Sequence, residues 1–224
     1  TPKTSSAASD VYKRQNLSRG EIVDQVLQLS NRSSSKITNV VFMGMGEPFL
    51  NYKKVVESAK IINEKIGLGA RRITISTSGI VSKIYLMADE RLPFKLAVSL
   101  NAPSDEIRKE IMPITITNPI NELLKAAEYY YSKLRRFVTF EYVLLDNVNS
   151  DEQCAHHLIK LLKNIPCKVN IIPYNEIDSQ YKRPKSKVIN NFVRILDDAP
   201  FTTTIRWSKG TNIDAGCGQL AIRD

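Results

Sequence analysis

The sequence predicts an α/β fold in which helices alternate with the strands of a parallel sheet. Three features of its 224 residues support this prediction: apolar runs of strand length, segments of helical period between them, and small or polar residues where the runs end. Regular alternation of this kind is typical of β/α units. In such folds the ligand site forms at the carboxyl ends of the strands.

Helix starts are indicated at four places. The pairs Ser18–Glu21 and Ser150–Gln153 have the spacing of a capping box. Asn51 is suited to cap a second helix, and Asn118–Pro119 places a cap before a first-turn proline. A last helix is expected over about 186–198.

Six apolar runs are predicted to be strands, and five of them end in short stretches with polar residues or glycine. These stretches are GMGEP, STSG, SLNA, YVLLD and IPYN. Taken singly, each is explained equally well by a turn or a helix cap, and Glu47 in GMGEP could simply be solvated. Several of them at the same end of one sheet favour a shared ligand site, because turns alone do not require them to converge.

The net charge of +9 comes from 32 Lys and Arg against 23 Asp and Glu. Such an excess favours polyanionic partners such as nucleic acid, although it also serves solubility. No apolar run approaches the roughly 18 residues that span a bilayer, and the start does not resemble a secretory signal. We therefore expect a cytoplasmic protein with no membrane partner. The basic residues cluster in KLRR (133–136), YKRPKSK (181–187) and Arg71–Arg72.

The three cysteines have different surroundings in the sequence. Cys217 lies between two glycines in DAGCGQL, so it is either a nucleophile on a flexible loop or an incidental free thiol. Cys154 on a helix and Cys167 at the start of a strand are expected to be packing residues. His156 and His157 are adjacent on one helix and point about 100° apart, so they do not form a two-ligand metal face.

Six segments carry a resemblance to a known family: NVVFMGMGEPFLNY, ITISTSGI, LAVSLNAPSDEIRKEIMPI, FEYVLLDNVN, CKVNIIPYN and NIDAGCGQLA. Together they closely resemble the RlmN/Cfr family of radical S-adenosylmethionine (SAM) RNA methyltransferases, with the RlmN branch nearer. The resemblance runs from Asn16 to Ala221, and the combination of MGMGEP with DAGCGQLA is highly specific.

The resemblance implies an α/β fold of the radical SAM type, a partial (β/α)6 TIM-type barrel that is open on one side and holds SAM across the strand ends. It also implies that the carboxylate of Glu47 meets the methionyl amine of SAM. Asn101 stands where the family commonly has His, so its side-chain role does not carry over, whereas a backbone contact would. The matching SAM-binding residues are Gly46, Glu47, Ser76, Ser99, Leu100, Asn101 and Asn175.

The resemblance assigns the chemistry to Cys217, which matches the cysteine that carries the methyl group. In the family, one SAM methylates this cysteine, and a second SAM is cleaved at a [4Fe-4S] cluster to a 5′-deoxyadenosyl radical that activates the methyl. The methyl carbon is delivered to C2 of adenine in large-subunit rRNA, and by resemblance in tRNA. An electron donor such as flavodoxin and a monomeric state are also implied.

The family's CxxxCxxC cluster loop and the first barrel strand precede the segment that matches Asn16, so this chain is expected to lack them. Residues 5–15 resemble the translation of a sequencing adapter; we therefore expect residues 1–15 to be a disordered artefact and 16–224 to be the C-terminal portion of the radical SAM domain. The chain as written is then expected to be inactive. The alternative is a non-catalytic remnant that binds RNA and SAM, and a metabolic β/α enzyme would leave Cys217 unexplained.

Overall fold

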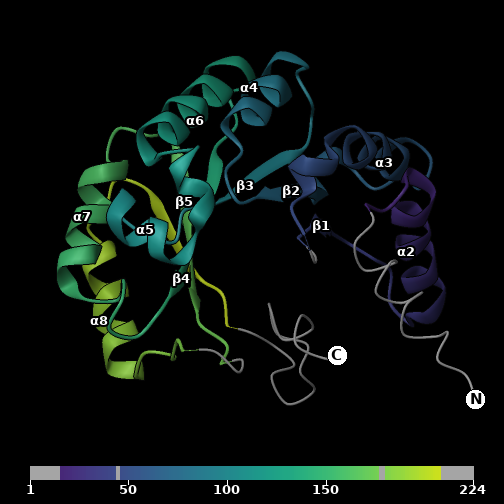
Figure 1. Cartoon of the computed structure of the whole chain (residues 1–224). Coiled ribbons are helices and arrows are strands. Elements are labelled where there is room, and N and C mark those ends of the chain that lie inside the picture. Colours follow the sequence, from purple (N-terminus) through teal and green to yellow (C-terminus); the bar gives the residue numbers. More distant parts are fainter. Residues whose placement is uncertain (1–15, 44–45, 177–179, 208–224) are drawn as a thin grey trace, which may run out of the picture.

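The computed structural model describes residues 16–43, 46–176 and 180–207. Six parallel strands form one sheet in the order β1-β2-β3-β4-β5-β6, and the sheet curves into an open arc (Figure 1). The α/β partial barrel expected from the sequence is thereby confirmed. The strands are β1 (Val40–Phe42), β2 (Ile73–Thr77), β3 (Lys95–Ser99), β4 (Val138–Leu144), β5 (Cys167–Pro173) and β6 (Thr202–Ile205).

Most of the helices lie along the outer side of the arc (Figure 1). Within the described residues, three short 3-10 helices precede other elements: η1 (Pro48–Asn51), η2 (Ala70–Arg72) and η3 (Pro113–Ile116). The α-helices are α2 (Arg19–Arg32), α3 (Tyr52–Glu64), α4 (Val81–Asp89), α5 (Asp105–Ile111), α6 (Ile120–Leu134), α7 (Glu152–Leu162) and α8 (Ser186–Leu196).

The two faces of the sheet have different side chains because successive residues of a strand point to opposite faces. The outer face is apolar and packs beneath the helices, as at Ile75, Val98 and Phe140, which are fully buried. The register aligns Ser99 with Glu141, and Glu141 with Asn170 on the inner face. The inner face is therefore polar, and it faces the hollow side of the arc.

Two of the helix starts show how local the capping signals are. The capping box of α2 is confirmed, because Ser18 Oγ accepts from Glu21 N–H (3.3 Å) and Glu21 Oε2 accepts from Ser18 N–H (2.7 Å). The capping box predicted at Ser150 is wrong. Asp151 caps α7 instead, with its Oδ1 accepting from Cys154 N–H at 2.7 Å, since a carboxylate one residue later has the better reach.

The other two predicted caps make tertiary contacts instead. Asn51 has no side-chain capping bond; its Nδ2 donates to the carbonyl of Leu17 at 2.8 Å. Asn118 Oδ1 accepts from Val81 N–H at 2.9 Å, so this side chain caps α4 rather than α6. No element was predicted from the sequence between Ser104 and Asn118, where the structure has α5 and η3.

Candidate functional site at the carboxyl ends of the strands

Glu47 joins the end of β1 to the end of β2. Its Oε1 accepts from Phe49 N–H (2.8 Å) and the Thr77 hydroxyl (2.7 Å), and its Oε2 accepts from Ser78 N–H (2.6 Å). Glu47 is thus bound into the strand ends rather than freely solvated. A carboxylate offers about four acceptor positions, so one position on Oε2 is left for a ligand donor.

Gly46 and Asn175 leave room and an unsatisfied polar atom at the same edge. Gly46 has φ +94°, a value that side chains other than glycine rarely adopt, and nothing lies within 4 Å of the Cβ it lacks. Asn175 is 5% exposed, and among the described residues its Oδ1 has no hydrogen-bond partner. A buried acceptor without a partner is costly, so a donor from a bound ligand is expected there.

The SLN triplet is held mainly through its backbone. Leu100 N–H and Asn101 N–H both donate to the carbonyl of Glu141 (2.9 and 3.2 Å), and Leu100 is fully buried. Asn101 adopts φ +58°, and its Oδ1 accepts from Val143 N–H at 2.9 Å. The Asn101 side chain therefore fixes the turn and is not directed to a ligand, while the partly buried Ser99 lies on the inner face.

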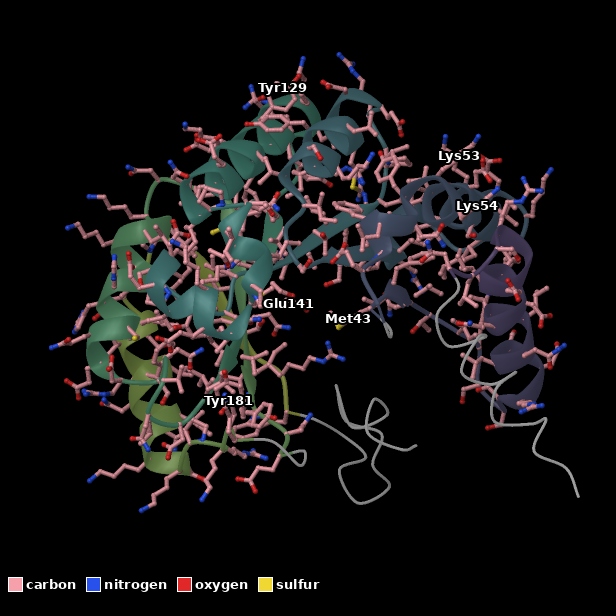
Figure 2. The ribbon with its side chains drawn as sticks, in the orientation of Figure 1. Met43, Lys53, Lys54, Tyr129, Glu141 and Tyr181 are labelled. Carbon is pink, nitrogen blue, oxygen red and sulfur yellow. The ribbon has the colours of Figure 1, made fainter. Side chains whose placement is uncertain are left out.

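A chain of polar side chains crosses the inner face below these loops. Ser76 Oγ donates to Glu141 Oε2 at 3.1 Å, Glu141 is hydrogen-bonded by Asn170, and Thr204 donates to Asn170 Oδ1 at 3.1 Å. Burial raises the pKa of Glu141, while its contacts with Ser76, Arg206 and Asn170 oppose the rise. Figure 2 shows Glu141 and Met43 on the inner side of the arc, and Arg206 reaches Met43 Sδ at 3.7 Å. The network thus links β2, β4, β5 and β6 beneath the predicted ligand site.

Arg108 is a site residue that the sequence reading did not single out, although it lies within the SDEIRKEIMPI segment. This fully buried guanidinium donates to the carbonyls of Ser78 (2.7 Å), Ser99 (2.9 Å) and Leu100 (3.0 Å). It also reaches the Thr115 hydroxyl at 3.0 Å, and burial lowers the pKa of Arg108 to about 10. Arg108 thereby positions the loops after β2 and β3 without itself facing the open edge.

The cysteines fall into two groups. Cys154 and Cys167 are buried, as expected, and burial raises the pKa of each thiol to about 12. Such thiols are poor thiolate donors for a metal or an iron–sulfur cluster. Cys217 lies outside the described residues. Over residues 16–43, 46–176 and 180–207, no group of three or more His, Cys, Asp or Glu is placed to hold a metal ion.

Two cofactors are implied, and the described residues fit one of them. The free acceptor position of Glu47, the open backbone at Gly46 and the unpaired Asn175 Oδ1 suit the amine, carboxylate and adenine of SAM. The described residues do not offer the three thiolates of a [4Fe-4S] cluster, because both described cysteines are packed in the core. Within the same part of the chain, no helix is long and apolar enough to cross a membrane.

Comparisons with known proteins agree with this geometry. The profile of the Radical SAM superfamily matches residues 4–158. A probable dual-specificity RNA methyltransferase RlmN from Thermoanaerobacter sp. (strain X514) is 44% identical over 93% of this chain and 61% of its own. The corresponding protein of Dictyoglomus thermophilum is 47% identical over 92% of this chain and 61% of its own.

Solved structures give the same result. A radical SAM methyltransferase from Sphaerobacter thermophilus superimposes with a TM-score of 0.89 at 42% identity, over 92% of this chain and 62% of that one. A domain of pyruvate-formate lyase-activating enzyme from Bacteroides vulgatus shares only the fold, at 18% identity and a TM-score of 0.60. This chain spans about 61% of the length of the curated RlmN relatives. The resemblance to RlmN proteins is confirmed, and the chain belongs to the Radical SAM superfamily.

Proposed function

We propose that this chain is the SAM-binding and methyl-carrying part of an RNA methyltransferase of the RlmN type, which modifies C2 of adenine in large-subunit rRNA and in tRNA. The proposal is supported by the positions of Gly46, Glu47 and Asn175, which follow the carboxyl ends of β1 and β5 of one parallel sheet, in a chain 44% identical to an RlmN relative. Ligand sites of β/α folds form at this edge.

SAM would be held mainly by groups that the strand ends leave unsatisfied. Glu47 Oε2 would accept from the methionyl ammonium, and Asn175 Oδ1 would accept from an N–H of the adenine. Ser76 and Ser99 lie on the inner face next to Glu141, where their hydroxyls suit the ribose. When bound, SAM supplies the methyl group and the source of a radical.

Cys217 would take the methyl group and carry it to the base. Its thiol would give up its proton and hold the methyl group as a thioether, with bound SAM as the source of that methyl. A carrier of this kind is needed because C2 of adenine is electron-poor and has no lone pair with which to attack SAM directly. The glycines on both sides of Cys217 suit a thiol that must move between two partners.

The RNA would approach the same edge. Trp207, after β6, is 50% exposed, and the Arg183 guanidinium lies 5.5 Å from its ring. An exposed aromatic ring beside a cation is a platform on which a base can stack. The net charge of +9 favours contacts with phosphates.

The 224-residue chain alone is proposed not to cleave SAM, because the described cysteines are core residues. Purified chain supplied anaerobically with iron, sulfide, reductant and SAM is expected to yield no 5′-deoxyadenosine. Formation of 5′-deoxyadenosine would contradict the proposed inactivity of the 224-residue chain, but not the proposed methylation of RNA. An electron donor such as flavodoxin, a monomeric state and a cytoplasmic location belong to the same proposal.

The division of the chain is also a proposal, and residues 1–15 lie outside the described residues. We propose that these residues derive from a sequencing adapter and that 16–224 is radical SAM sequence. Resequencing the locus without transposon-derived adapters tests this division. Genomic codons that encode residues 5–15 but differ from the adapter in their third bases would contradict it.

The function is tested in a chimera in which residues 16–224 replace the corresponding part of a curated RlmN relative. In a strain without its own enzyme, the chimera is expected to form 2-methyladenosine in rRNA, measured by mass spectrometry of nucleosides. Cys217→Ser is expected to abolish the product, whereas Cys154→Ala, a change at a buried thiol, is expected to retain it. Unchanged 2-methyladenosine with Cys217→Ser would refute the proposal.

The rival function, a non-catalytic remnant that binds RNA and SAM, is separated by the same chimera. If the chain is such a remnant, it is expected to bind SAM in titration calorimetry, and Asn175→Leu is expected to weaken that binding roughly tenfold. The chimera is then expected to form no 2-methyladenosine. Formation of the modified base favours the enzyme.

A further inference from the structure

A basic hollow of about 500 Å³ lies at the amino ends of the strands, opposite the edge that carries Glu47. The structure brings together two of the basic clusters of the sequence, Arg71 from η2 and the arginines that follow α6, with lysines from two strands. The lining residues are Arg71, Lys95, Leu134, Arg135, Arg136, Phe137, Thr139 and Lys168.

The two lysines belong to the inner face of the sheet. Lys95 precedes Ala97 and Ser99 by two and four residues, and Ser99 aligns with Glu141 on that face. Lys168 aligns with Thr139 and lies two residues before Asn170. Both lysines are exposed, although strands of a parallel sheet are usually covered on both faces. Two exposed lysines therefore place positive charge on a face that is ordinarily covered.

The two arginines after α6 are held in place by their backbone and by one hydrogen bond. Arg135 ends α6 in the left-handed conformation at φ +52°, which costs energy for a residue with a side chain. Arg136 Nη1 donates to the carbonyl of Pro93, just before β3. These contacts direct the tight turn between α6 and β4 toward the start of β3, where Lys95 lies.

In the described part of the chain, the cations of the hollow have no acidic partner. Among residues 16–43, 46–176 and 180–207, no Asp or Glu forms an ion pair with Arg71, Lys95, Arg135, Arg136 or Lys168. Five cations in one concavity repel one another, and a concave wall concentrates their field. An anion with several charges along its length is the ligand that relieves this repulsion.

An aromatic pair beside the hollow favours a nucleic acid over other anions. The rings of Tyr131 and Phe137 stack at 5.6 Å with an interplanar angle of 22°, and the guanidinium of Arg135 lies 5.7 Å from the Tyr131 ring. Phe137 is 50% exposed. Exposed aromatic faces among cations are typical of surfaces that bind nucleic acid, because bases stack on the rings while phosphates meet the charges.

We propose that this hollow is a second RNA site, which binds the phosphodiester backbone of the substrate RNA away from the base being modified. The proposal rests on the proposed function as far as the identity of the RNA is concerned. Contacts to phosphates position an RNA without reading its sequence. A site at the far end of the strands therefore adds affinity for a large folded RNA without changing the requirements at the base.

The first test measures RNA affinity of the 224-residue chain by fluorescence anisotropy over a range of salt. Lys95→Gln/Lys168→Gln is expected to weaken binding roughly tenfold or more at low salt, and to reduce the slope of log K against log salt by about 1.4 for two contacts with single-stranded RNA. The control is Lys53→Gln/Lys160→Gln, which removes the same charge from the outer faces of α3 and α7; Figure 2 shows Lys53 on α3. Unchanged affinity and slope in the first variant overturn the proposal.

A second variant separates stacking from charge. Phe137→Ser is expected to weaken RNA binding roughly fivefold while leaving the salt slope unchanged.

Chemical acetylation of the wild-type chain, measured by mass spectrometry, locates the bound RNA directly. RNA is expected to protect Lys95 and Lys168 from acetylation but not Lys53. Equal modification of all three lysines with and without RNA overturns the proposal even if a variant misfolds.

Two probes separate RNA from other anions. Tripolyphosphate and polyglutamate are expected to compete only weakly with RNA at the hollow. Competition by tripolyphosphate as strong as that of RNA would indicate a site for a small polyphosphate, and equal competition by polyglutamate would indicate an acidic protein; either result overturns the assignment. A failure of these tests leaves the 2-methyladenosine result of the chimera untouched, so the two proposals fail separately.

Discussion

At the scale of single residues, Arg108 connects the loops that carry the predicted SAM site. Its guanidinium donates to the carbonyl of Ser78 in the loop after β2 and to that of Ser99 at the end of β3. It also donates to the carbonyl of Asn118 at 3.3 Å, just before α6. Gly79 lies against this side chain, since a Cβ at Gly79 would meet Arg108 Nη2 at 3.1 Å. The loop geometry and the arginine therefore depend on each other.

Arg108→Met is expected to lower the free energy of unfolding by roughly 3 kcal/mol or more, because buried carbonyls lose their donors. SAM affinity should fall with it, as Ser78 and Ser99 are released. Urea unfolding and calorimetric titration measure the two effects. Lys109→Met, which removes a neighbouring exposed cation, is the matched control, and similar stabilities of the two variants would contradict the role given to Arg108.

Glu141 is the residue whose charge state links the site to pH. It is 6% exposed, and burial raises the pKa of its carboxyl above the ordinary value of 4.5. Between 4.5 and the raised pKa, the folded state binds this proton more tightly than the unfolded state does. The free energy of unfolding therefore falls as the pH rises through this interval, because the folded protein must give up a proton that it binds tightly.

Glu141→Gln is expected to gain stability relative to the wild type as the pH rises from 4.5, because the amide has no proton to lose. Thermal unfolding at a series of pH values measures the difference. Glu128→Gln on the exposed side of α6 controls for the loss of a carboxylate. A constant difference between wild type and Glu141→Gln over the whole range would show that burial does not perturb this group.

At the scale of elements, several helix ends are satisfied by residues from other elements. Asn118 Oδ1 accepts from the first N–H of α4, at Val81, although the two residues are 37 positions apart. The N–H of Ile120, at the start of α6, donates to Asp105 Oδ1 of α5 at 2.8 Å. These bonds join α4, α5 and α6 at the edge where the loops of the proposed SAM site lie.

Asn118→Ala is expected to lower the free energy of unfolding by about 1 kcal/mol, the usual cost of a lost helix cap. Hydrogen exchange should show faster exchange at the start of α4, not of α6. Asn164→Ala, in the exposed turn after α7, is the control. Faster exchange at the start of α6 instead would show that Asn118 caps α6, as predicted from the sequence, and would contradict its role at α4.

At the scale of the whole molecule, the sheet is open at β1. In the part of the chain that the structure describes, β1 pairs only with β2. A hollow of about 600 Å³, with walls from α2 and β1, leaves Leu29 63% exposed and Val41 49% exposed. An unpaired strand beside exposed apolar side chains can pair with another chain.

The 224-residue chain, proposed to be a monomer at low concentration, is therefore expected to self-associate as its concentration rises. Val41→Lys is expected to reduce this association because a charged edge strand resists pairing. Sedimentation velocity over a concentration series measures it. Leu50→Lys changes a side chain that is 73% exposed but does not line this hollow, and should have no effect. A chain that stays monomeric at high concentration would rule out pairing through β1.

Much of the fold was predictable, because strand and helix periodicities and the glycines and polar residues at strand ends are local signals. The six strands, the edge where the polar loops gather and the burial of Cys154 and Cys167 follow from them. The local signal was misleading at Ser150, where the better cap is Asp151, and no element was predicted for the stretch after β3 that forms α5.

The sequence by itself determined the alternation of helices and strands, the edge of the sheet where the polar loops gather, and the similarity to radical SAM proteins. Only the tertiary structure decided that Glu47 is bound by Thr77, that Ser76 meets Glu141 65 residues away, and that the clusters at Arg71 and Arg135 line one hollow. The reason is physical. Periodicity depends on neighbours along the chain, whereas hydrogen bonds and clustered charges depend on how distant segments pack.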